Sequence, residues 1–294
     1  MPTAGIILNT FRETVRRPFY FVLLGTGAAA ILATLPLPLF TFYNDTDMYK
    51  DLGLSFVLLF VLLMALTAAA TSIASEVEEK TAQTVLSKSV GRWQFIVGKY
   101  LGVMTAVGLG LLLLGVVFTA AVYYRVRLDA NVIERIYARG GIGQDVEAFR
   151  ARQIAQALTV IPGLALILLQ VGVLAAVATA ISTRISPAAS VGLSLVIFLV
   201  GHLTVFLESA RHVFRGAAGV VRQGILALVP FLEIFNLNEK LSRSMLTPFD
   251  AGSPGAADWS AIWAYVGWAA LYALAYIVLA LGVGIVLFRR RSIS

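Results

Sequence analysis

The sequence contains no cysteine and very little charge. The absence of cysteine excludes disulfides, thiolate metal sites and thiol nucleophiles. Charged residues make up 13% of the 294 residues and hydrophobic residues 59%, and the mean hydropathy is +0.85. Soluble globular domains carry about 25% charged residues. The composition therefore predicts a polytopic membrane protein.

About six long apolar runs account for this composition. A spanning helix needs roughly 20 apolar residues, whereas a barrel strand is about half as long and alternates in polarity. Lipid offers no partner to backbone amides, so runs of this length are expected to be helical. The predicted fold class is all-α, a single transmembrane domain over 1–294 with spans at 19–42, 53–74, 100–123, 155–182, 187–207 and 261–288. Pro36 and Pro38 are expected to kink or fray the outer end of the first run.

Arginines near the two ends of the chain predict its orientation. Arg12, Arg16 and Arg17 precede the first run, and 289–291 follow the last. Since Lys and Arg beside a span favour the cytoplasmic side, both termini are predicted to be cytoplasmic. The segment 1–18 is then expected to be an interfacial helix along the cytoplasmic leaflet.

The same orientation predicts two extracytoplasmic loops, 124–153 and 208–260. The first loop interleaves arginines with acids such as Asp145 and Glu147, which is typical of a small amphipathic element. Within the second loop, 224–236 is apolar but broken by proline, and a re-entrant or interfacial outer element is expected there. The net charge of +7 is spread beside helices rather than in one stripe, so no nucleic-acid partner is expected.

The segment 75–99 is the one strongly charged stretch between two long apolar runs. Ser75 followed by Glu76 and Glu78 is typical of a helix start, because acids favour the positive end of the helix dipole. Trp93 and the apolar residues after it are suited to the membrane interface. On physical grounds alone, an ordinary polar cytoplasmic loop remains an equal alternative.

The order of residues in this segment resembles the signature of ABC type 2 exporter permeases, which runs approximately Glu-x-Glu-x-Gly-Thr, Leu-Leu-Ser-x-Pro-Val-x-Arg and then Gly-Lys. Lys80 and Ser89 depart from it, in the places of a glycine and a proline. The matching residues are Glu76, Glu78, Glu79, Thr81, Leu86, Ser87, Val90, Arg92, Ile96, Gly98 and Lys99. The stretch ending in Phe235 and Asn236 is also similar to the branch that includes the nitrous-oxide-reductase maturation permease.

The resemblance implies the membrane subunit of an ATP-driven exporter in a bacterial inner membrane. Its first cytoplasmic loop would dock on a separate ABC ATP-binding subunit, and the turn 182–187 would make a minor second contact. A second permease copy or homologue is expected to complete a dimer. The implied coupling residues are Glu76, Glu78, Glu79, Thr81, Leu86, Ser87, Val90 and Arg92.

The chain itself is not expected to bind a cofactor or to act as an enzyme. The sequence has no Gly-x-x-x-x-Gly-Lys-Ser/Thr motif, so ATP and Mg²⁺ are assigned to the partner subunit. His202, Glu208 and His212 cluster in sequence, but His202 falls on the opposite side of a helix from Glu208, and no metal site is predicted. A membrane scaffold without transport of its own is the alternative function. An intramembrane enzyme is a third, and its activity would depend on His202, Glu208 and His212.

Small residues recur every four positions on the third run, at Gly98, Gly102, Ala106 and Gly110. Such a ridge allows another backbone to come close. Packing within the subunit is the favoured use, and a dimer seam or a wall of the translocation route is the alternative. Gly172, Ala176 and Ala180 form a shorter ridge on the fourth run. Ser186 and Pro187 are typical of the start of a helix.

Overall fold

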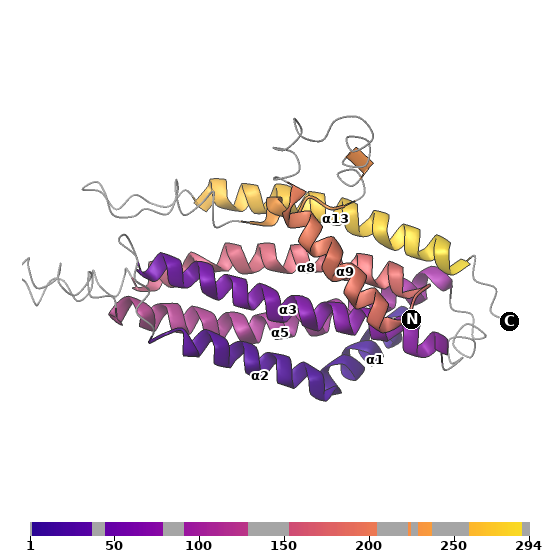
Figure 1. The fold of residues 1–294 in the computed structure, drawn as a ribbon, viewed down its shortest axis with the longest axis horizontal. Coiled ribbons are helices and arrows are strands. Elements are labelled where there is room, and N and C mark those ends of the chain that lie inside the picture. Colours follow the sequence, from indigo (N-terminus) through magenta and orange to yellow (C-terminus); the bar gives the residue numbers. More distant parts are fainter. Residues whose placement is uncertain are drawn as a thin grey trace, which may run out of the picture.

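The computed structural model describes residues 2–36, 45–78, 91–128, 153–204, 223–224, 229–236 and 259–289, and every regular element within these ranges is helical. Figure 1 shows long helices lying side by side along one axis. The start of α1 (Pro2–Arg16) and the end of α13 (Trp259–Arg289) lie at the same end of the bundle. We call this end the α1 end and the opposite one the far end.

The chain begins with two helices that meet at a sharp bend. α1 and α2 (Pro18–Ala33) are inclined by 62°, and Arg17 between them is extended, with φ −69° and ψ 129°. Proline at the first position of α2 explains the break, because it disfavours helical geometry in the preceding residue. α2 ends at Ala33, three residues before Pro36, so the described helix is shorter than the predicted run 19–42. Residues 37–44 of that run lie outside the described ranges.

Two long helices follow and run in opposite directions. α3 (Asp45–Glu78) has 34 residues and α5 (Arg92–Leu128) has 37, which correspond to about 51 and 55 Å. Both exceed the predicted spans 53–74 and 100–123. The helix start predicted at Ser75 is wrong, because Ser75 to Glu78 form the last turn of α3. Glutamate is a good helix former and allows the helix to continue through Glu76 and Glu78, although acids at the end of a helix oppose its dipole.

α5 also extends into the segment predicted as a loop from residue 124. Arg125 is only 4% exposed, and its guanidinium donates to the Leu35 carbonyl at 2.5 Å. The same group lies 5.7 Å from the centre of the Tyr49 ring. Because these groups inside the bundle bind the cation, the helix continues to Leu128 instead of ending where the charges begin. Residues 129–152 of the predicted loop are not among those described.

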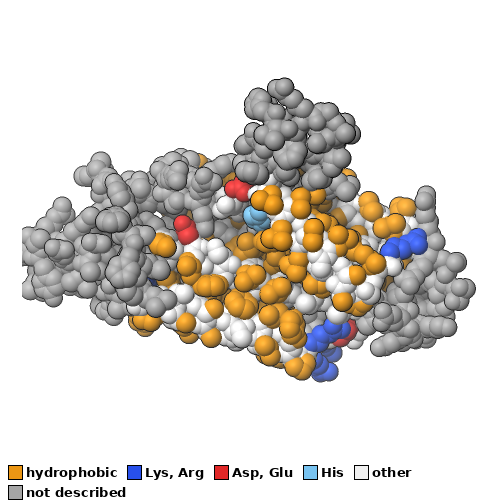
Figure 2. All heavy atoms as spheres, in the orientation of Figure 1, with side chains coloured by type: hydrophobic (Ala, Val, Ile, Leu, Met, Phe, Trp, Pro, Cys, Tyr) orange, Lys and Arg blue, Asp and Glu red, His pale blue; other side chains and the backbone are white. Residues whose placement is uncertain are grey.

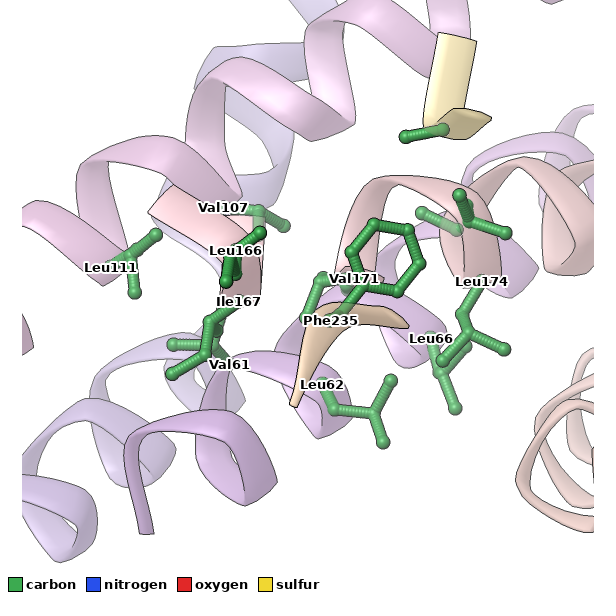
Figure 3. Packing of buried hydrophobic residues seen from close by; sticks show 14 of the residues in the cluster. Val61, Leu62, Leu66, Val107, Leu111, Leu166, Ile167, Val171, Leu174 and Phe235 are labelled. Atoms are coloured by element: carbon green, nitrogen blue, oxygen red, sulfur yellow. The ribbon is translucent and has the colours of Figure 1, made fainter. Parts of the chain in front are cut away.

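α8 (Val160–Ser182) forms the centre of the bundle and packs against α3, α5, α9 (Pro187–His202) and α13. Figure 3 shows its side chains meeting those of α3 and α5 in one hydrophobic cluster. α9 begins at Pro187, as predicted, after the turn that follows Ser182. The labelled residues of the cluster are Val61, Leu62, Leu66, Val107, Leu111, Leu166, Ile167, Val171, Leu174 and Phe235.

The predicted outer element between the fifth and sixth runs is described over 229–236. It contains a short 3-10 helix, η2 (Leu232–Phe235), whose two terminal side chains are buried. The Phe231 amide donates to the Tyr272 hydroxyl at 2.8 Å, and the Tyr265 hydroxyl donates to the Ile234 carbonyl at 2.6 Å. This element is therefore packed onto α13 and into the core instead of resting on the surface of the bundle.

Four described segments are long and apolar enough to cross a membrane: Met48–Ile73, Trp93–Val126, Gln153–Ser182 and Trp259–Phe288. The bent pair α1 and α2 could supply a fifth, and α9 is a shorter apolar helix. Figure 2 shows hydrophobic side chains over most of the described surface in view. The prediction of an all-α polytopic membrane protein is confirmed. The count of six and the sidedness of the termini stay predictions.

Candidate functional site

Three of the eight predicted coupling residues are among those described, and they lie at the end of α3 and the start of α5, at the α1 end. Glu76 and Glu78 belong to the last turn of α3, and Arg92 is the first residue of α5. The other five, Glu79, Thr81, Leu86, Ser87 and Val90, lie outside the described residues. The described part of the site is therefore the pair of helices that leave this segment and the side chains that fix them to their neighbours.

The first half of the small-residue ridge on α5 packs against α1. A Cβ added at Gly98 would lie 3.0 Å from the Ile6 side chain. A Cβ added at Gly102 would lie 2.6 Å from the Thr10 Cβ and 2.8 Å from the Ile7 carbonyl oxygen. No side chain fits at the second distance, because a backbone atom cannot move aside without shifting α1. Glycine at 102 thus allows α1 to lie directly against α5.

The second half of the ridge packs against α2. The Tyr20 hydroxyl donates to the Ala106 carbonyl at 2.9 Å. A Cβ added at Gly110 would lie 3.1 Å from the Tyr20 hydroxyl oxygen and 3.0 Å from the Met64 sulfur. All four positions of the ridge therefore face helices of the same chain. In the shorter ridge, Gly172 lies beside Tyr100, and Ala180 touches Gly284 of α13.

Four polar side chains tie α1, α3 and α5 together, and we call them the junction cluster: Glu13, Arg17, Thr71 and Lys99. Lys99 is only 2% exposed, and its ammonium nitrogen lies 3.7 Å from the Glu13 carboxylate. Arg17 pairs with the same carboxylate and also donates to the Thr71 hydroxyl. A buried cation needs such a partner, since desolvation of an isolated charge is costly. The cluster therefore fixes α1 to both helices that flank the coupling segment.

The position of the junction cluster along these helices is symmetrical. Thr71 lies seven residues before the end of α3 at Glu78, and Lys99 lies seven residues after the start of α5 at Arg92. Seven residues correspond to about two turns, or about 10 Å along each axis. The resemblance to permeases included Gly98 and Lys99 without a structural role for either. In the structure they are the α1-facing glycine and the buried cation of the cluster.

The start of α5 also meets the end of α13. The Phe95 and Phe288 rings stack with their centres 6.0 Å apart, and both side chains are almost fully buried. Arg184, in the turn between α8 and α9, donates to the Leu287 carbonyl at 2.8 Å. The turn 182–187, predicted as a minor second contact, therefore lies against the end of α13. We refer to Phe95, Arg184, Leu287 and Phe288, which make these contacts at the end of α13, as the α13 bracket.

His202 lies away from these clusters, near the end of α9. Its Nε2 is 3.3 Å from the Gln170 amide nitrogen of α8, and its Nδ1 is 3.1 Å from the Phe198 carbonyl. Glu208 and His212 lie outside the described residues. Within the described ranges, no group of three His, Cys, Asp or Glu side chains is placed to hold a metal. His202 is therefore held as a packing and hydrogen-bonding residue between α8 and α9.

These features define a helical membrane protein in which polar contacts join α1, α3 and α5 beside the charged segment between α3 and α5. The sequence profile of the ABC-2 family transporter proteins matches residues 20–293 of the chain. The match covers nearly the whole sequence, and the chain belongs to this family. A comparison with curated individual proteins gives no match. The chain is therefore a membrane component of the kind found in ABC transporters, as its charged segment predicted.

Proposed function

We propose that the chain is the permease subunit of an ATP-driven exporter in a bacterial inner membrane, and that a separate ATP-binding subunit docks on residues 76–92. Family membership and the order of residues in the charged segment support this function. The observation that carries it is the arrangement at the α1 end, where both helices leaving the coupling segment are tied to their neighbours within two turns.

This arrangement suits the transmission of movement. Force applied between Glu78 and Arg92 reaches α1 through the junction cluster and reaches α13 through the Phe95–Phe288 contact. Packed interfaces transmit displacement because their interiors are dense and resist compression. In the proposed cycle, ATP and Mg²⁺ act in the partner subunit, and this chain converts the movement of that subunit into a change of angle of its spans. A second permease copy or homologue completes the translocation route for the substrate.

Purification from native membranes in mild detergent tests the proposed partner. We expect the wild-type chain to retain a nucleotide-binding subunit at about one per permease, with ATPase activity in the complex. The substitution Leu86→Asp places a charge in the predicted contact and should release that subunit, as should the double reversal Glu78→Lys/Glu79→Lys. We expect the thermal stability of the permease itself to stay unchanged, because the substitutions fall in the segment predicted to dock on the partner.

A matched double reversal, Asp145→Lys/Glu147→Lys, makes the same change of charge in the loop predicted on the opposite side of the membrane. This control should retain the ATP-binding subunit. If the wild-type chain is recovered without any ATPase, the scaffold function is favoured instead. Loss of the subunit in the control as strongly as in the coupling variants would show that net charge alone governs the association.

A further inference from the structure

The charged residues of α1, together with Arg17 directly after it, divide into two groups that face opposite directions. Glu13 and Arg17 face the bundle and belong to the junction cluster. Arg12 and Arg16 are exposed, and neither makes an ion pair or hydrogen bond within the part of the chain that the structure describes. The outer face of α1 therefore carries two arginines and no acid. Both precede residues 20–293, so they lie outside the match to the family.

These two arginines lie where the chain enters the membrane. α2 begins at Pro18 and consists almost entirely of apolar residues, so Arg16 is two residues from the first turn of that helix. The side chain of Leu8, one turn before Arg12 on the same face, is 49% exposed, and that of Phe19 is 50% exposed. Figure 2 shows basic side chains gathered at the bend between α1 and α2, at the edge of the hydrophobic surface.

We propose that Arg12 and Arg16 form a binding site for the phosphate group of an anionic phospholipid in the leaflet that contacts α1. Side chains four residues apart on a helix have Cβ atoms about 5–6 Å apart, so two guanidinium groups can contact one headgroup. Each guanidinium presents a planar fork of donors that matches a phosphate. Leu8 and Phe19 on either side would contact the glycerol and acyl region of the same lipid.

An exposed apolar residue on each side of the arginine pair favours lipid over an acidic protein surface. A contact with a polar protein face would leave Leu8 and Phe19 in water, whereas a lipid covers the apolar and charged parts together. Glu13 on the opposite face of α1 pairs with Lys99, and Arg17 directly after α1 donates to Thr71. A bound lipid would therefore fix α1 between the leaflet and the helices beside the coupling segment.

Native mass spectrometry of the full-length chain tests this site. The delipidated protein in neutral detergent is titrated with phosphatidylglycerol and, separately, with phosphatidylcholine of the same acyl chains. We expect one tight site for phosphatidylglycerol. An arginine near an anionic headgroup contributes about 1 kcal/mol, so Arg12→Gln/Arg16→Gln should weaken this site by about thirtyfold and leave phosphatidylcholine binding unchanged. Arg12→Lys/Arg16→Lys, which keeps the charge but loses the fork, should give an intermediate affinity.

The matched control is Arg290→Gln/Arg291→Gln, which removes two positive charges beside the last span. It should leave the tight site intact, and an equal loss of affinity in this variant would overturn the proposal in favour of a general effect of basic charge. Equal affinity of the wild-type chain for both lipids would overturn it as well. So would an Arg12→Gln/Arg16→Gln variant that keeps its lipid but loses the ATP-binding subunit, because the arginines would then contact protein.

Discussion

Two glycines of α5 differ completely in their surroundings. A Cβ at Gly102 would lie 2.6 Å from Thr10 and 2.8 Å from the Ile7 carbonyl, whereas nothing lies within 4 Å of a Cβ at Gly108. We predict that Gly102→Ala lowers the free energy of unfolding by about 1–3 kcal/mol, the usual cost of overpacking. Gly108→Ala should raise it by up to about 1 kcal/mol, because alanine is the better helix former.

Unfolding by SDS titration in detergent micelles measures both variants against the wild-type chain. The two substitutions are chemically identical and lie on the same helix, so the difference between them isolates the contact with α1. A Gly102→Ala variant as stable as Gly108→Ala would show that α1 does not lie against α5 in solution.

Single residues also show how far the sequence predicts the packing. The spacing of Gly98, Gly102, Ala106 and Gly110 predicted a close helix contact, and packing within the subunit was the favoured use. The structure shows which helices make that contact. The burial of Arg125 could not be predicted, since its partners are the Leu35 carbonyl and the Tyr49 ring, which are distant in sequence. A backbone carbonyl carries no residue-type signal, so such a partner cannot be predicted from composition or periodicity.

Among the long helices, α13 is the least buried. In its most apolar stretch 28% is buried, compared with 50–67% in the corresponding stretches of the other three long apolar segments. Phe288 is 2% exposed and stacks on Phe95, whereas Val286 is 50% exposed on the same turn. We predict that Phe288→Ala lowers the free energy of unfolding by about 3 kcal/mol, the low end for a buried phenylalanine.

The matched variant Val286→Ala should lower it by less than about 0.5 kcal/mol, the usual limit for an exposed site. Hydrogen exchange of α13 amides at the α1 end gives the second measurement. It should rise in Phe288→Ala and not in Val286→Ala, because only the first removes the contact with α5. Equal exchange in the two variants would show that the stacked rings do not hold this helix end.

The ends of the helices are predicted less well than the presence of the helices themselves. Hydropathy located the apolar part of α3 and α5, since that part must match the hydrocarbon thickness. It did not locate their ends, because both helices are longer than the roughly 20 residues that a span requires and their ends are set by tertiary contacts. The junction cluster is an example, because Glu13, Thr71 and Lys99 are far apart in sequence. The bend at Arg17 allows α1 to lie against α5. Local patterns predicted a helix at 1–18 but not that it would be held by a buried cation.

At the scale of the whole molecule, α5 is one of the two helices, with α3, that connect the coupling segment to the far end. It has 37 residues and is fixed at one end by the junction cluster and the α13 bracket, and at the other by Arg125. It also contains five glycines, which could let it bend. Four of them are packed against side chains of other helices, whereas among the described residues no atom lies within 4 Å of a Cβ added at Gly108. We therefore expect α5 to move as one rigid helix during the proposed transport cycle.

Spin labels test this expectation without removal of native thiols, because the chain has no cysteine. Trp93 and Tyr124 are 56% and 57% exposed, and 31 residues of helix separate them by about 46 Å. We predict that the distance between Trp93→Cys and Tyr124→Cys labels is the same in nucleotide-free and ATP-trapped complexes. The distance between Trp93→Cys labels on the two permease copies should change, since the same movement reorients whole helices. A shorter or broader 93–124 distance on ATP trapping would show that α5 bends between the labels, with Gly108 the expected hinge because no described side chain lies within 4 Å of an added Cβ there.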